Sequence, residues 1–155
     1  MYRRILVTLD GSNLAEQVLP HVKALIERQT GVQVYLFSVA QVIDLAAASA
    51  MVYPMAVLPG KPVDEAAARQ RVEDELCDYL RGVELQVAGE GVQVTRAVHF
   101  GRPAEEIISY ARDIRADLIA MCTHGRSGIA RWAYGSVADR VLHGAECPVL
   151  LVRAK

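Results

Sequence analysis

The chain has 155 residues, 52% of them apolar and 23% charged, with a formal net charge of −1. This length and composition predict one globular domain over residues 1–155 with a full hydrophobic core. The absence of a basic block argues against a nucleic-acid partner. No apolar run is long enough to span a membrane or form a signal-peptide core, and three widely spaced cysteines favour reduced thiols. We therefore expect a cytoplasmic protein without membrane contact.

Short apolar runs alternate with helical patterns along the first forty residues. Residues 4–9 are rich in Ile, Leu and Val, which is typical of a strand covered on both faces. Apolar residues at helical spacing follow, and we expect one helix that Pro20 bends and Gly31 closes. Residues 32–39 are expected to be the second strand. Together these elements predict a right-handed βαβ unit.

The pattern lapses between residues 40 and 62, an apolar segment with three prolines. Connections this long are usually functional or mobile, and one so apolar should be covered. Two interpretations stay open: a lid or subunit contact, and an excursion packed on its own domain. From Asp64 to about Ala88, apolar residues recur at helical spacing, which predicts a long helix that ends at Gly89.

The second half of the chain repeats the alternation of strand and helix patterns. Residues 92–98 alternate as a half-buried strand does, which favours a place at the sheet edge. Pro103 fits the first position of the helix that follows. Residues 118–121 and 149–152 are expected to be the fourth and fifth strands. Alternating elements of this kind predict an α/β fold with a parallel, doubly wound sheet.

The stretch between the fourth strand and the last helix carries the strongest functional signal. Gly125 can adopt positive φ, and Gly135 with Ser136 opens the helix with free amide N–H groups that suit an anion. Ser136 is the predicted N-cap, with Asp139 three residues later at a capping-box-like spacing. The residues alone leave two interpretations open, a phosphate site and a capped connection that contains glycines.

The spacing of Gly125, nine residues and then Gly135-Ser136 resembles the nucleotide-binding signature of the universal stress protein family. Cys122 stands where the ATP-binding form of the family has its first glycine. The similarity runs nearly end to end and includes three further stretches, residues 4–12, 101–107 and 147–152. It implies a Rossmann-like α/β fold, a doubly wound open sheet of five parallel strands in the order 3-2-1-4-5 with helices on both faces.

The resemblance also implies where a ligand would bind. In such a sheet the winding direction reverses between the first and fourth strands, and ligands bind outside the carboxyl ends of the strands at that point. Carried over position by position, the resemblance implies an ATP site, with Mg²⁺ or Mn²⁺ as companion ion, formed by Thr8, Leu9, Asp10, Val39, Met121, Cys122, Gly125, Arg126, Gly135, Ser136 and Val137. The base would lie near Thr8, Asp10 and the Val39 backbone. The phosphates would lie near Gly125 and residues 135–137. Asp10 and Ser136 are equally consistent with simple helix caps, and Arg126 is equally consistent with a solvated side chain.

No catalytic motif accompanies these residues. The chain has no P-loop, no GxGxxG after a strand and no GxSxG elbow, and Asp10 is the one credible carboxylate for phosphoryl transfer. The leading interpretation is a stress-associated ATP-binding sensor or regulatory module with slow or no hydrolysis. One alternative is a family member that does not bind ATP and acts through dimerisation and protein contacts. The other is an adenine-nucleotide hydrolase-like enzyme.

Assembly can also be predicted from the last strand. Val149 to Val152 are four consecutive apolar residues at the sheet edge opposite the third strand, and such edges invite another chain. The resemblance likewise implies a homodimer that places the final strands of two subunits side by side. The other interpretation is a strand covered by its own preceding helix.

Overall fold

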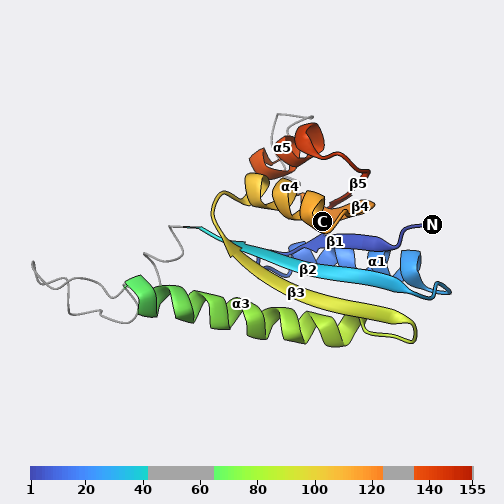
Figure 1. Ribbon diagram of the computed structural model, residues 1–155, viewed down its shortest axis with the longest axis horizontal. Coiled ribbons are helices and arrows are strands. Elements are labelled where there is room, and N and C mark those ends of the chain that lie inside the picture. Colours follow the sequence, from blue (N-terminus) through green and yellow to red (C-terminus); the bar gives the residue numbers. More distant parts are fainter. Residues whose placement is uncertain (42–64, 124–134, 155) are drawn as a thin grey trace, which may run out of the picture.

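The computed structural model describes residues 1–41, 65–123 and 135–154. Five parallel strands form one sheet in the order β3-β2-β1-β4-β5 (Figure 1). The strands are β1 (Arg4–Thr8), β2 (Val32–Ala40), β3 (Val92–Phe100), β4 (Leu118–Thr123) and β5 (Val149–Arg153). The helices are η1 (Ala15–Val18), α1 (Leu19–Ile26), α3 (Glu65–Val87), α4 (Pro103–Asp113) and α5 (Ser136–Gly144). The predicted fold class and strand order are confirmed.

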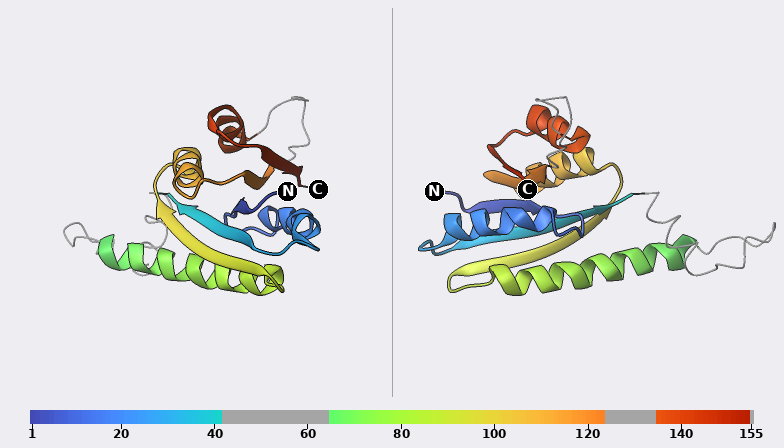
Figure 2. Two further views of the ribbon diagram at one scale, coloured as in Figure 1. Left: turned by 45° about the vertical axis from the view of Figure 1, so that its right-hand side comes forward. Right: turned by 180° about the vertical axis from the view of Figure 1, so that it is seen from behind.

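Helices cover both faces of this sheet (Figures 1 and 2). One apolar cluster joins η1, α1 and α3 to the sheet, and a second joins α4 and α5 to the opposite face. In the central strand β1, Ile5 and Val7 face the first cluster and Leu6 faces the second, and all three are fully buried. Burial on both faces is the reason that this strand has a continuous apolar sequence and no alternation.

The first helical segment differs from the expected single bent helix. The chain forms a 3₁₀ turn, η1, and then begins α1 at Leu19, with Pro20 in the first turn. Proline is compatible with that position because the N–H groups of a first turn have no helical acceptor. The prediction that Pro20 bends a continuous helix was therefore wrong. Within the described residues, no helix combines the length and the apolar character needed to cross a membrane.

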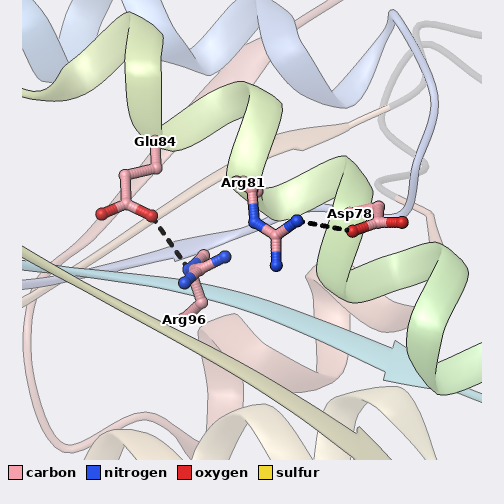
Figure 3. A network of polar contacts seen from close by, with 4 residues as sticks. All are labelled: Asp78, Arg81, Glu84 and Arg96. Carbon is pink, nitrogen blue, oxygen red and sulfur yellow. Dashed lines mark hydrogen bonds and ion pairs between the residues drawn. The ribbon is translucent and has the colours of Figure 1, made fainter.

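An ion pair joins α3 to the edge strand β3. Arg96 Nε of β3 lies 2.9 Å from Glu84 Oε2 of α3, while Arg81 and Asp78 form a pair within the helix at 3.1 Å (Figure 3). The side chains of Arg96 and Glu84 are 34% and 30% exposed, whereas those of Arg81 and Asp78 are 66% and 71% exposed. Exposed pairs contribute about 0.2–1 kcal/mol. The pair between helix and strand should therefore lie at the upper end of that range.

Candidate functional site

A cavity of about 290 Å³ lies at the carboxyl ends of β1, β2 and β4. It is therefore located where the strand order reverses between β1 and β4, the position at which open α/β sheets bind ligands. Its volume is close to the lower end of the range for small-molecule sites. Strand ends, the helical segments η1, α4 and α5 and the residue after β5 contribute to its lining. The described lining residues are Thr8, Leu9, Asp10, Leu14, Ala15, Phe37, Val39, Gln41, Pro103, Ile107, Met121, Cys122, Thr123, Gly135, Ser136, Val137, Ala138 and Ala154.

Each predicted site residue in the described part of the chain lines this cavity. They are Thr8, Leu9, Asp10, Val39, Met121, Cys122, Gly135, Ser136 and Val137. Gly125 and Arg126 lie outside the described residues. The fold thus brings together residues from four separate parts of the sequence, while their role in binding a nucleotide stays a prediction.

Asp10 is positioned by the turn that follows β1. Its Oδ1 atom accepts hydrogen bonds from the Ser12 N–H at 3.0 Å and from the Ser12 hydroxyl at 2.6 Å. The Ser12 hydroxyl oxygen in turn accepts from the Ala15 N–H at 3.1 Å, at the beginning of η1. Asp10 therefore orients the residue that caps the helical turn and does not cap it directly. Its Oδ2 atom has no hydrogen bond within the described residues.

The beginning of α5 differs from the predicted capping box. The N-cap is Gly135, whose carbonyl accepts from the Asp139 N–H at 2.9 Å, and no side chain of the described residues caps the helix. Ser136 is already the first helical residue, so its prediction as N-cap was wrong. The Gly135 N–H donates to Thr123 Oγ1 at 3.3 Å, which fixes the helix start to the end of β4.

This arrangement leaves backbone donors at the cavity. The first N–H groups of a helix have no intrahelical acceptor. In α5 they belong to cavity-lining residues, Ser136, Val137 and Ala138. Unpaired donors combined with the positive end of the helix dipole attract phosphate or carboxylate groups. The geometry can therefore bind an anion at this end of the cavity.

Cys122 contributes a neutral side chain to the lining. Burial raises the pKa of its thiol, the charge of Asp10 raises it further, and the Val18 backbone partly opposes both effects. The thiol therefore stays protonated at neutral pH. Within residues 1–41, 65–123 and 135–154, no group of three or more His, Cys, Asp or Glu side chains is arranged to hold a metal ion.

Sequence reasoning missed several apolar residues of the cavity lining, among them Phe37, Pro103 and Ile107. Phe37 is fully buried and stacks on Tyr110 of α4, with ring centroids 4.5 Å apart and an interplanar angle of 19°. Its position could have been inferred, because Phe37 and Val39 are two residues apart and lie on the same face of β2. Pro103 and Ile107 had no such signal, since the sequence does not show which helix covers the cavity.

Comparison with known proteins identifies the family. The sequence model described as the universal stress protein family matches residues 1–153. The chain belongs to the universal stress protein family. Among its relatives is universal stress protein MJ0531 of Methanocaldococcus jannaschii, which is 31% identical over 153 residues, covering 99% of this chain and 83% of the relative. Universal stress protein YxiE of Bacillus subtilis is 29% identical and is covered over its full length.

Solved structures agree with the family membership. The structure of the hypothetical protein MJ0577 of Methanocaldococcus jannaschii has a TM-score of 0.77 and 26% identity, covering 100% of this chain and 98% of the other. Two more distant structures match at the level of the fold. One is a universal stress protein in complex with cAMP, at TM-score 0.60 and 17% identity, and the other is the Archaeoglobus fulgidus protein in complex with dAMP, at 0.53 and 21%.

Proposed function

We propose that this universal stress protein binds ATP in the cavity between β1 and β4 and acts as a sensor or regulatory module in the cytoplasm. One observation carries the proposal: a single cavity combines a strand-edge backbone, a carboxylate and a helix N-terminus at the point of strand reversal. Universal stress proteins of the same fold form complexes with cAMP and dAMP, which supports an adenine nucleotide as the ligand.

The base would occupy the apolar end of the cavity. Phe37, Ile107 and Met121 provide a largely apolar surface there, and all three are buried. β2 extends beyond β1, so the N–H and C=O groups of Val39 lie at a free strand edge. The adenine ring carries acceptor nitrogens beside a donor amino group. A backbone donor and acceptor side by side can pair with such a ligand.

The phosphates would lie against the beginning of α5. The amide groups of residues 136–138 supply donors there, and we propose that Gly125 and Arg126 complete this part of the site. A Mg²⁺ or Mn²⁺ ion bound with ATP would be held mainly by phosphate oxygens and water, because such ions need only one or two protein carboxylates. Asp10 is the carboxylate that lines the cavity.

Catalysis is not part of the leading proposal. Efficient phosphoryl transfer uses a placed base in addition to metal-holding groups. Among the described residues that line the cavity, Asp10 is the only Asp or Glu and no histidine is present. We therefore infer that bound ATP is turned over slowly, if at all.

Calorimetric titration tests the proposal directly. We expect purified protein to bind one ATP per chain, with phosphate release far below about 10 per second, the median rate of enzymes. Native mass spectrometry of freshly purified protein should show the same nucleotide bound. Absence of ATP binding in both measurements would support the alternative that the chain acts through protein contacts alone. Turnover near the enzyme median would instead support a hydrolase.

The exposed edge of β5 leads us to propose a homodimer. Within the described residues β5 pairs with β4 alone, and Val149 to Val152 are each half-buried. Side-by-side pairing of two such strands around a two-fold axis would satisfy their backbone groups and cover their side chains.

We expect Leu150→Lys to convert a dimer into a monomer, measured as mass by light scattering. Leu85→Lys is the control, because Leu85 is 79% exposed on α3. Wild-type protein that is monomeric at micromolar concentration would contradict the proposal.

A further inference from the structure

A side chain holds the carboxyl ends of β1 and β2 together. Leu9 follows β1, and its N–H donates to the Phe37 carbonyl at 2.9 Å, which continues the strand pairing by one bond. The Leu9 carbonyl then accepts from the Ser38 hydroxyl at 2.8 Å. Ser38 is 1% exposed and Leu9 is 4% exposed, so both groups are shielded from water.

In a regular parallel ladder, a different donor would bond to the Leu9 carbonyl. The pairing of Thr8 with Phe37 and the bond from Leu9 show that odd-numbered residues of β2 direct their backbone groups toward β1. The next bond of the ladder would therefore run from the Val39 N–H to the Leu9 carbonyl. The backbone hydrogen bonds of the described residues do not include it, and the Ser38 hydroxyl bonds to that carbonyl in its place.

We propose that Ser38 is a positioning residue of the nucleotide site. Its hydroxyl donates to the Leu9 carbonyl in place of the Val39 N–H, and this leaves the Val39 N–H available to the ligand base. The identity of the ligand rests on the proposed function. A buried carbonyl needs a donor. Without the Ser38 hydroxyl, the nearest donor along the ladder is the Val39 N–H. If that N–H donated to the Leu9 carbonyl, it would no longer be available to the base at the strand edge.

Amide hydrogen exchange followed by NMR tests this role in the nucleotide-free protein. An amide without a hydrogen bond exchanges fast even within a strand. We expect the Val39 amide of wild type to exchange at least about tenfold faster than that of Phe37. In Ser38→Ala the Leu9 carbonyl should capture the Val39 amide, and its exchange should slow toward that of Phe37. A protected Val39 amide in wild type, or unchanged exchange in the variant, would overturn the inference.

ATP titration provides the second measurement. We expect Ser38→Ala to weaken binding about five- to tenfold, the effect of one hydrogen bond. Ser38→Thr keeps the hydroxyl and should restore wild-type affinity. Val34→Ala is the control for a purely structural loss, because Val34 is fully buried on β2 and is not among the cavity-lining residues, so the change should lower stability and leave affinity unchanged.

The outcomes separate this inference from the proposed function. Equal ATP affinity in wild type and Ser38→Ala would overturn the positioning role even if ATP binds well. Failure of wild type to bind ATP would refute the proposed function, whereas the exchange measurement would still decide whether Ser38 frees the Val39 amide. If Ser38→Ala does not fold, Ser38→Cys serves instead, since a thiol has similar shape and is a much weaker donor.

Discussion

Gly135→Val is expected to weaken ATP binding by about 100-fold or more while the protein stays folded. Gly135 lines the cavity, and the nearest atom of the described residues that an added Cβ would meet is Thr123 Oγ1 at 4.0 Å. Its φ of −56° is accessible to any residue. The valine methyl groups would therefore fit the fold but occupy space beside the α5 amides that we assign to the phosphates.

Calorimetry of wild type and Gly135→Val measures this effect, with circular dichroism as the check on folding. Gly82→Val is the matched control. A Cβ at Gly82 also meets no described residue within 4 Å, but this glycine lies on α3 and is not among the cavity-lining residues. Equal ATP affinity in a folded Gly135→Val protein would refute the proposed phosphate site.

Phe37→Ala is expected to lower the free energy of unfolding by about 3–5 kcal/mol, the usual range for removing a buried aromatic side chain. Phe37 has no exposed surface and belongs to the cluster that joins α4 and α5 to the sheet. Its ring also stacks on Tyr110 at 4.5 Å, and its loss would leave that ring with only its edge contacts to Tyr35 and His99 among the described residues. A loss of this size is a large fraction of the stability of an ordinary domain.

Urea denaturation measures the change, as a lower midpoint at unchanged slope. The other phenylalanine of the chain, Phe100 at the end of β3, is the comparison. It is half-buried and lies under the Arg69 guanidinium at 4.2 Å, so Phe100→Ala should cost less than half as much. Equal losses in the two variants would show that Phe37 is not the main packing residue of this cluster.

The strands were predictable from local sequence because a parallel sheet buries both faces of its inner strands. β1 is a continuous apolar run for that reason, and the more polar β3 occupies the edge that its alternation predicts. The long helix α3, expected from Asp64 to about Ala88, extends from Glu65 to Val87. In each case the side-chain pattern reports directly on burial.

The features that were predicted wrongly or not predicted are those that tertiary contacts determine. A serine followed three residues later by an acidic residue predicts an N-cap at Ser136, but the contact between the Gly135 N–H and Thr123 begins the helix one residue earlier. The bond from Ser38 to Leu9 joins two strands, and no local pattern contains it. Coverage of the cavity by Ile107 likewise depends on how α4 packs, which the spacing within that helix does not determine.

The central position of β1 has a consequence for how the protein acquires its site. β1 pairs with β2 on one side and with β4 on the other, and the Asp117 carboxylate accepts from the Arg3 and Arg4 N–H groups more than a hundred residues away. Closing so long a loop is a slow, late step of folding. The cavity includes residues from Thr8 to Ala154, so a growing chain on the ribosome has no complete site until residue 154 has been synthesised. Any nucleotide bound there would stabilise only the completed fold and would act against its unfolding as a whole.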